Sequence, residues 1–212
     1  MKYHHRLIVA GLLAFATSPL GAQNEDPWAT LDTVRKSLAT AGPEAARFVQ
    51  TFVPAGFSTG ESEQGQLALH LPDCLRWDYE QPYPKAFLVC GARVYSWNPE
   101  DRRGQRSWIE REKEPGLDLL LLPATSLAER YDAKLEARPG RRVAILLTPK
   151  SGHGGASLKE ATLVVDLAAA RLVELSYADL EGNRTCFEIS AYHALGETTK
   201  FNPPEGIVWE DG

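Results

Sequence analysis

The feature that most constrains this chain is a hydrophobic period of two residues that recurs along most of its length. In the stretch LRWDYE (residues 75–80), Leu75, Trp77 and Tyr79 alternate with charged side chains. Because the side chains of a β-strand point alternately to opposite faces, this stretch predicts a strand with one apolar and one solvated face. Similar stretches recur roughly every 8 to 12 residues, separated by turn residues. A meandering antiparallel sheet is therefore the expected core of the fold.

A helix is expected before the first of these strands. Asp26-Pro27 is a helix start signal, and Leu31, Val34 and Leu38 recur at helical spacing before Gly42. The period of residues 45–53 fits either the end of a helical region or a first strand. The later predicted strands are residues 66–71, 75–80, 86–90, 93–97, 106–112, 131–137, 142–148, 161–166, 172–178 and 184–192.

One leucine-rich segment interrupts the predicted sheet. Residues 117–122 hold five leucines, and residues 125–130 have helical composition. Together they predict two short helices. Five leucines so close together are more than one buried face of a surface helix requires. We therefore expect this segment to bury one side on the sheet and another side on a further group.

Composition bounds the class of protein. The chain has 212 residues, 43% of them hydrophobic and 24% charged, which is typical of one globular domain or two small ones. Its net charge is −5, and its lysines and arginines are scattered along the sequence. A nucleic-acid partner is not expected, because such proteins carry a positive stripe.

The N-terminus has the pattern of a secretory signal peptide. A basic start, residues 2–6, precedes a short apolar run, residues 7–16, and a small-residue region that ends at Ala22. We assign residues 1–22 to a cleaved signal peptide and residues 23–212 to a single mature domain, soluble after export. A retained membrane anchor is the alternative, although the apolar run is short for a bilayer span.

Export permits disulfide bonds among the three cysteines. If the strands at residues 75–80 and 86–90 form a hairpin, Cys74 falls nearly opposite Cys90, on the outer face with Arg76. A cross-strand disulfide between Cys74 and Cys90 is one reading, and unpaired thiols are the other, since connectivity cannot be read from sequence alone.

Residues able to carry chemistry are scarce in this sequence. It contains no nucleophile-elbow, dinucleotide-binding or phosphate-binding motif and no metal-ligand spacing, so neither a metal nor a cofactor is expected. His153 lies in a glycine-rich stretch typical of a hairpin loop. Glu110 and Glu112 alternate with basic residues, which favours a solvated strand face. A hydrolase that uses His153 or one of these carboxylates is a rival interpretation.

The distinctive feature is apolar surface in excess of what a simple core requires. An antiparallel sheet that curls on itself beneath helices can enclose an apolar cavity for a greasy ligand. Strand alternation and the hairpin register point one set of side chains inward: Leu67, Leu69, Trp77, Tyr79, Phe87 and Val89. An ordinary filled core is the alternative. Tyr95 and Trp97 point outward if Gly91-Ala92 is a two-residue turn, and inward if the turn is bulged.

Several ordered motifs resemble those of the LolA family of outer-membrane lipoprotein carrier proteins. LRWDY (residues 75–79) with Pro82, then Cys90-Gly91 and WNP (residues 97–99), is similar to the central hairpins of that family. LTPK (residues 147–150) and FNPPEGIV (residues 201–208) resemble two later segments. The order and spacing fit from about residue 26 to the end of the chain.

This resemblance implies a mainly β fold, an unclosed antiparallel half-barrel covered by short helices, and no enzymatic activity. It implies a monomeric carrier in the Gram-negative periplasm that shields the acyl chains of lipoproteins, or of a related lipid. The implied partners are an inner-membrane ATP-driven extractor and an outer-membrane receptor. Trp77 matches the strand tryptophan of the family, and residues 117–122 match its lid, where Leu119, Leu120 and Leu122 are the expected lid contacts.

One position departs from the family pattern. The family usually has an arginine before the proline at residue 72, and there the arginine helps to hold the lid closed by polar contacts. This chain has Leu71 at that position. The departure leaves the cargo and the handover step open. A periplasmic module that senses lipids or lipoproteins without transporting them is the alternative function.

Overall fold

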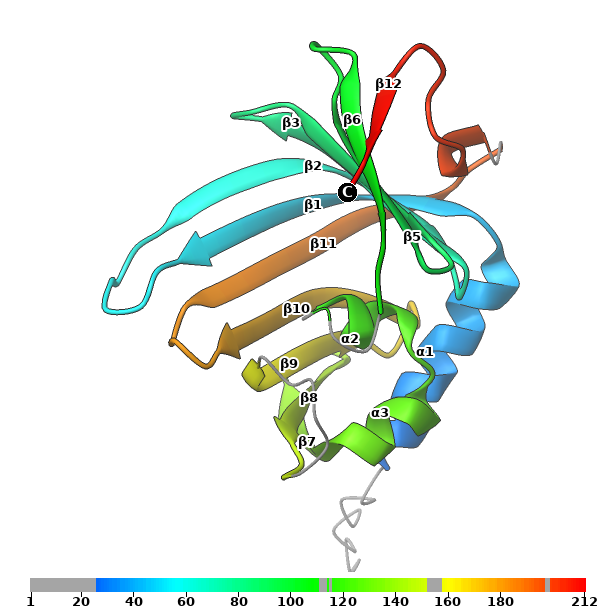
Figure 1. Cartoon of the computed structure of the whole chain (residues 1–212). Coiled ribbons are helices and arrows are strands. Elements are labelled where there is room, and N and C mark those ends of the chain that lie inside the picture. The colour runs from blue at the N-terminus through cyan, green and yellow to red at the C-terminus, as the bar shows by residue number, and fades with distance from the viewer. Residues whose placement is uncertain (1–25, 111–113, 115, 152–157, 197–198) are drawn as a thin grey trace, which may run out of the picture.

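The alternating stretches form one sheet that wraps around a set of short helices (Figure 1). The computed structural model describes residues 26–110, 114, 116–151, 158–196 and 199–212. The predicted signal peptide, residues 1–22, and His153 lie outside the described residues.

The sheet has 12 strands in the order β12-β6-β5-β4-β3-β2-β1-β11-β10-β9-β8-β7. Neighbouring strands are antiparallel, except that β12 runs parallel to β6. The predicted unclosed antiparallel sheet is confirmed, because β12 and β7 stand at its two edges. The strands are β1 (Glu44–Val53), β2 (Glu61–His70), β3 (Cys74–Gln81), β4 (Lys85–Cys90), β5 (Arg93–Asn98), β6 (Arg103–Trp108), β7 (Tyr131–Arg138), β8 (Arg142–Pro149), β9 (Leu158–Asp166), β10 (Arg171–Asp179), β11 (Arg184–Ala194) and β12 (Val208–Asp211).

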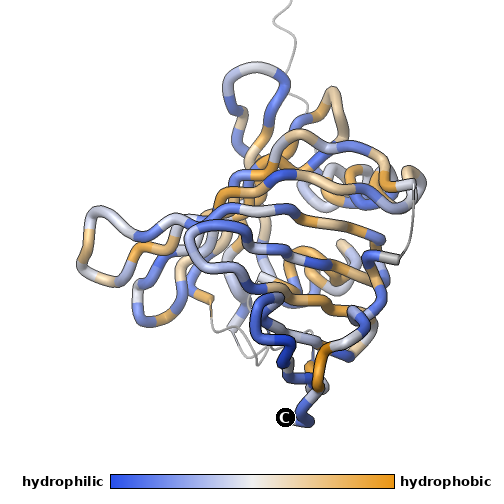
Figure 2. Tube along the Cα trace, turned by 90° about the horizontal axis from the view of Figure 1, so that it is seen from above, coloured by the Kyte–Doolittle hydropathy of each residue, from blue (hydrophilic) through white to orange (hydrophobic). Residues whose placement is uncertain are grey.

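The two-residue period explains why these segments are strands. Hydrophobic and hydrophilic residues alternate along much of the tube in Figure 2. In β3, Leu75 and Trp77 are buried while Arg76 and Asp78 are half-buried on the other face. Alternate side chains of each strand therefore point to the concave face of the sheet.

The first helix, α1 (Pro27–Ala41), begins and ends where the sequence predicts. The Asp26 carboxylate accepts a hydrogen bond of 3.0 Å from the backbone N–H of Trp28, and Pro27 occupies the first turn. Gly42 ends the helix with a φ of 77°, which glycine adopts without strain. Leu31, Val34 and Leu38 are buried against the core.

The leucine-rich segment forms the two predicted short helices. They are α2 (Leu117–Leu121) and α3 (Ala124–Arg130), separated by Leu122 and Pro123. Together with α1 they cover the concave side of the sheet (Figure 1). We call α2 and α3 the lid. Leu119, Leu121 and Leu127 are the buried side chains with which the lid packs into the core.

Several elements differ from the sequence-based expectation, and β2 begins at Glu61 rather than at residue 66. Residues 44–53 are a strand in the centre of the sheet, paired with β2 and β11. Strand β6 covers residues 103–108 and so starts earlier than residue 106, directly after the preceding turn, whereas residues 111–112 of the predicted strand lie outside the described residues. Strand β12 was not predicted. It is four residues long, and its parallel pairing with β6 depends on where the C-terminal segment returns to the sheet.

The C-terminal segment covers the convex side of β3, β4 and β5. Cys90 pairs with Arg93, so Gly91-Ala92 is a two-residue turn, and Tyr95 and Trp97 point outward. Trp209 packs against both rings, with centroid distances of 5.2 Å and 6.0 Å. We call this group the convex core: Ala68, Ala86, Leu88, Trp97 and Phe201, with partly buried Tyr95, Leu195, Ile207, Trp209, Cys74 and Cys90.

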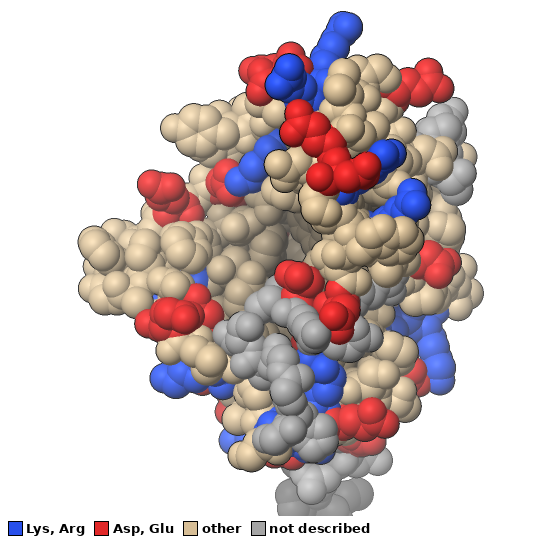
Figure 3. All heavy atoms as spheres, in the orientation of Figure 1, with Lys and Arg blue, Asp and Glu red and all other residues tan. Residues whose placement is uncertain are grey.

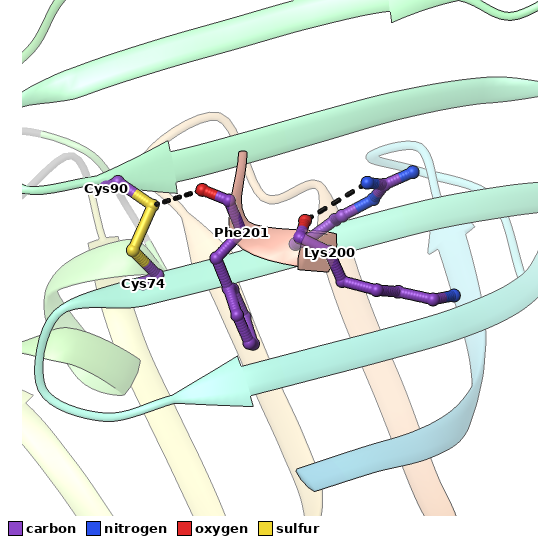
Figure 4. The surroundings of a disulfide bond; sticks show 5 residues. Cys74, Cys90, Lys200 and Phe201 are labelled. Carbon is purple, nitrogen blue, oxygen red and sulfur yellow. Dashed lines mark hydrogen bonds between the residues drawn. A yellow bond between two sulfur atoms is a disulfide. The ribbon is translucent and has the colours of Figure 1, made fainter. Parts of the chain in front are cut away.

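A disulfide joins Cys74 and Cys90 within the convex core, with an S–S length of 2.06 Å. The two residues are cross-strand neighbours in the register of β3 and β4. Figure 4 shows the bond beside the C-terminal segment, where Cys90 Sγ lies 3.6 Å from the carbonyl oxygen of Phe201. Arg76 donates a hydrogen bond of 3.1 Å to the carbonyl of Lys200. Arg76 thus holds the chain return at residues 200–201 against the sheet, beside the disulfide.

Among the helices that the structure describes, none has the length and hydropathy that crossing a membrane requires.

Candidate lipid-binding site

An apolar pocket of about 250 Å³ lies between the concave face of the sheet and the lid. Figure 3 shows this face of the molecule hollowed near its centre, with acidic side chains at the margins of the hollow. The pocket is lined by Trp77, Tyr79, Phe87, Val89, Val94, Gly116, Leu117, Leu120, Leu175, Tyr177 and Phe187. Its walls offer hydrocarbon and aromatic surface with two phenol groups, which suits a greasy ligand.

Four of the predicted cavity residues line this pocket together. Trp77 pairs with Phe87 and Leu75 pairs with Val89 in the antiparallel register of β3 and β4, so their concave-facing side chains meet. Tyr79 follows Trp77 on the same face. The lid contributes Leu120, one of the three predicted lid contacts.

The aromatic side chains make a continuous floor. Tyr79 meets Phe48 edge to face with ring centroids 4.9 Å apart, and it meets Phe87 in the same way at 5.9 Å. Phe48 also lies 6.1 Å from Phe187. Edge-to-face contacts of this kind hold rings in place. The floor is therefore fixed by its own contacts before any ligand arrives.

The lining from β5, β10 and β11 was missed by the sequence analysis. Val94 faces inward because the two-residue turn sets the parity of β5. Leu175, Tyr177 and Phe187 belong to strands that were predicted without a stated face. Tyr177 also packs against Gly116, where an added Cβ would lie 3.0 Å from its ring and where φ is 83°. A glycine at the start of α2 thus lets the lid approach the pocket wall.

Other predicted residues lie outside this pocket. Leu69 and Leu119 line a second apolar pocket of about 30 Å³ between α1, the lid and the sheet, and Leu71 lines it as well. Leu67 is 1% exposed and packed in the core. Leu122 caps the end of α2 and is buried in the same core. Leu67 and Leu122 line neither apolar pocket.

An arginine contact with the lid comes from α1, not from the position before Pro72. Arg35 donates hydrogen bonds of 2.7 Å and 2.9 Å to the carbonyl oxygens of Leu119 and Leu120. These carbonyls lie in the last turn of α2, where carbonyl groups lack helical partners. Leu71 lines the same small pocket as Arg35 and contributes only apolar contact. The polar lid contact that the family pattern implies for residue 71 is made here by Arg35.

Burial affects the pKa of the Arg35 guanidinium. Desolvation lowers the pKa of Arg35 to about 10, while Asp118 and Asp32 act in the opposite direction. The guanidinium therefore stays charged at neutral pH, and its hydrogen bonds to the lid carbonyls are charge-assisted.

A buried carboxylate anchors the other side of α2. Asp118 is 2% exposed and accepts hydrogen bonds from the Tyr131 hydroxyl, at 2.6 Å, and from the backbone N–H of Leu119, at 2.7 Å. Arg130 approaches it to 3.8 Å. Burial raises the pKa of Asp118, and these hydrogen bonds and the Arg130 charge oppose the rise. The lid is thus attached to β7 as well as to α1.

The arrangement offers an apolar binding surface. In the described part of the chain, no cluster of three or more His, Cys, Asp or Glu side chains is placed to hold a metal ion. Chemically, the site can shield hydrocarbon from water beneath the leucines of the lid.

Comparison with protein families gives a match over most of the chain. Residues 42–202 match the family model of the outer membrane lipoprotein carrier protein LolA. An outer-membrane lipoprotein carrier protein from Xanthomonas oryzae pv. oryzae is 27% identical, and the alignment covers 96% of each chain. A protein of the same name from Klebsiella pneumoniae is 22% identical over 78% of this chain and 80% of its own.

Solved structures share the fold at low sequence identity. An uncharacterized conserved protein from Thermus thermophilus aligns with a TM-score of 0.56 and 14% identity, covering 87% of this chain and 98% of its own. MucB aligns with a TM-score of 0.52 and 12% identity, covering 84% of this chain and 64% of its own.

Proposed function

This chain belongs to the LolA family of outer membrane lipoprotein carrier proteins, and from that premise we propose that it is a carrier that shields the acyl chains of lipoproteins. The acyl chains would occupy the pocket between the sheet and the lid. The observation that carries the proposal is this apolar pocket of about 250 Å³ with a leucine-rich cover.

The physical chemistry of the pocket suits reversible transport. Burying one methylene of an acyl chain is worth about 0.8 kcal/mol, so even part of a chain gains several kcal/mol. Contacts with Leu, Val and aromatic side chains are non-directional, so a chain can slide in and out without breaking specific bonds. Such a site can compete with a membrane and can still release its cargo.

The lid must move for this function. Pockets that hold drug-sized ligands measure about 300–1,000 Å³, so about 250 Å³ leaves little room for several acyl chains. Leu120 contacts both apolar pockets, so an outward movement of α2 would join them. Rupture of the Arg35 hydrogen bonds to Leu119 and Leu120 would accompany that movement. In this proposal Arg35 closes the lid and its release opens the cavity.

The predicted site residues take roles in this scheme. Trp77, Tyr79, Phe87 and Val89 form the floor that contacts the chains, and Leu120 covers them. Leu69, Leu71 and Leu119 line the small pocket into which the cavity can expand. Leu67 and Leu122 support these surfaces from the core.

The location and partners belong to the same proposal. A signal peptide over residues 1–22 would direct the chain to the periplasm, where residues 23–212 act as one lipid-binding domain. An inner-membrane ATP-driven extractor would load the protein, and an outer-membrane receptor would accept the cargo. The names of the curated relatives support this placement.

A cavity-filling substitution tests the proposal. Val94 lines the pocket and is half-buried, so Val94→Phe places a ring in the unfilled volume. We expect the wild-type protein to bind a fluorescent triacylated cysteinyl peptide and Val94→Phe to bind it at least about tenfold more weakly. Val208→Phe, on exposed β12, is the control. Equal binding by Val94→Phe and wild type would remove the pocket from the proposal.

A transfer assay separates carriage from sensing. The purified protein is loaded with labelled lipoprotein from inner-membrane vesicles and offered to outer-membrane vesicles. A carrier moves the label between the two membranes, and a module that only senses lipids retains it.

A further inference from the structure

Four polar side chains lie together on the concave face, beside the wall that Tyr79 gives to the apolar pocket: Gln50, Glu63, Tyr79 and Lys85. We call them the polar collar. We propose that the polar collar is a head-group subsite, which takes an uncharged head bearing ester and amide carbonyls and disfavours an anionic phosphate head. This inference rests on the proposed function, because it assumes that the acyl chains lie in the pocket.

The register of the sheet places the collar on the concave face. Gln50 follows Phe48 by two residues along β1, so both side chains face the concavity, and Gln50 pairs with Glu63 of β2. Tyr79 pairs with Lys85 across the β3–β4 hairpin. Because residues 54–60 and 82–84 are the turns that follow, the collar lies at the end of the sheet away from the disulfide.

Tyr79 joins the collar to the pocket. Its ring lines the pocket beside Phe87, and its hydroxyl donates a hydrogen bond to the side-chain oxygen of Gln50. Lys85 Nζ lies 4.5 Å from the centroid of the same ring. A ligand whose chains contact the ring of Tyr79 therefore brings its head to Gln50 and Lys85.

The hydrogen bonds within the collar leave donors for a ligand. Lys85 Nζ donates to both oxygens of Glu63, at 2.7 Å and 2.9 Å, and an ammonium group has three protons. Gln50 uses its oxygen to accept from Tyr79, so both protons of its amide nitrogen stay available for acceptors. The ester and amide carbonyls next to the acyl chains of a triacylated cysteine are acceptors of this kind. Glu63 can accept a hydrogen bond from an amide N–H of the same head.

The charge of the collar argues against a phosphate. Glu63 neutralises Lys85, and the pair is partly shielded, with side chains 20% and 38% exposed. Glu61 lies two residues before Glu63 in β2, on the same face and next to the turn at residues 54–60. Burial and the Glu63 charge raise the pKa of Tyr79, which keeps its hydroxyl neutral. An anionic head would meet Glu63 and Glu61 in a setting where solvent screens charge less than in water.

The tests use two probes: a synthetic triacylated cysteinyl peptide with an uncharged head, and phosphatidylglycerol. Affinities are measured for the full mature chain by competition against one fluorescent acyl probe. We expect Glu63→Gln, which leaves Lys85 without its counter-charge, to shift the affinity ratio about tenfold toward phosphatidylglycerol. We expect Gln50→Leu to weaken the peptide about tenfold and to leave phosphatidylglycerol nearly unchanged.

Matched variants exclude a purely structural effect. Arg47 and Glu80 form a comparable ion pair on the convex face, with a shortest distance of 2.9 Å, so Glu80→Gln removes one surface carboxylate away from the pocket. Glu80→Gln should keep the wild-type ratio, and Glu63→Asp should largely restore it. Thermal unfolding identifies a variant that is misfolded, and Gln50→Leu supplies the readout if Glu63→Gln does not fold.

The outcomes separate the two proposals. If the wild-type protein binds the peptide but the ratio is unchanged in Glu63→Gln and Gln50→Leu, the head-group subsite is wrong and the carrier function stands. Equal wild-type affinity for both probes also overturns the subsite. If the wild-type protein binds neither probe, the carrier function and the subsite both fail.

Discussion

The two faces of the β3–β5 region are both apolar, yet only one of them is filled by the chain itself. On the convex side, Trp97, Leu88 and Phe201 are buried beneath the C-terminal segment, and Trp209 closes the group. On the concave side, Trp77 and Phe87 face a pocket of about 250 Å³ below the lid.

The sequence marks both faces in one short stretch. Residues 86–90 are apolar at every position, so each parity of β4 needs a cover. Ala86 and Leu88 pack against aromatic side chains from residues 201–209 of the same chain. Phe87 and Val89 are covered by α2, which leaves an unfilled pocket between its leucines and the strands. The comparison teaches that a strand with apolar side chains on both faces predicts packing segments on both faces. It does not by itself predict which face contains a cavity.

Two tryptophan substitutions give the largest expected effects and can break this comparison. Trp97→Ala should lower the free energy of unfolding by about 3–5 kcal/mol, because its ring is buried in a filled site. Trp77→Ala should cost less, about 2 kcal/mol, since one side of its ring faces unfilled volume. Denaturant unfolding measures both free energies, and titration with lipopeptide measures binding by each folded variant. We expect only Trp77→Ala to lose ligand, and loss of binding in folded Trp97→Ala would contradict the separation of the two faces.

Removal of the disulfide tests the convex core alone. The double variant Cys74→Ala/Cys90→Ala opens a loop with a sequence separation of 16 residues. Loops of this length correspond to about 3 kcal/mol of stability. Unfolding midpoints with and without reductant should differ for the wild type and coincide for the variant. Binding of the lipopeptide at low temperature should be equal in both proteins.

A substitution at Arg35 tests whether this side chain holds the lid closed. Arg35→Met keeps the aliphatic stem and removes the two hydrogen bonds to the lid carbonyls. We expect loaded lipopeptide to dissociate about tenfold faster, as for a change of about 1.4 kcal/mol in one barrier. Stopped-flow release into excess vesicles measures the rate. Lys36→Met alters an exposed neighbour whose ion pair with Asp32 lies at the surface, and it should release ligand at the wild-type rate.

The smallest effect concerns the carboxylate beneath the lid. Because burial raises the pKa of Asp118, the folded state binds its proton more tightly than the unfolded state does. The contribution of Asp118 to stability therefore declines as pH rises from its ordinary pKa, about 4, to its raised value in the folded state. Thermal midpoints of the wild type and Asp118→Asn, compared across this window, should diverge with increasing pH in favour of the variant. Parallel curves would show that Tyr131 and Arg130 fully offset the burial.

Much of the fold followed from local patterns. The cap at Asp26-Pro27 predicted α1, and alternation predicted most strands of the sheet. The floor residues Trp77, Tyr79, Phe87 and Val89 could be placed on one face because a single hairpin relates them. Local spacing was enough wherever the partners lie close together in sequence.

The remainder depends on contacts between distant segments. Arg35 lies on a polar stretch of α1, and its partner Leu120 is 85 residues away, so its sequence context resembles that of any surface arginine. The orientation of Tyr95 and Trp97 depended on the length of one turn. Strand β12 is too short and acidic to show a period, and only the exposed edge of β6 gives it a partner.

An open sheet has a consequence for how copies of the molecule behave at high concentration. Among the strands that the structure describes, the two outer ones, β7 and β12, each leave a row of backbone donors and acceptors without a neighbouring strand, and such rows invite pairing with another copy. Acidic and basic side chains interleave along β7, where Glu136 bridges Lys134 and Arg138, and β12 ends in Glu210 and Asp211. These charges oppose fibre-like stacking, so the half-barrel can stay unclosed without becoming a template for aggregation.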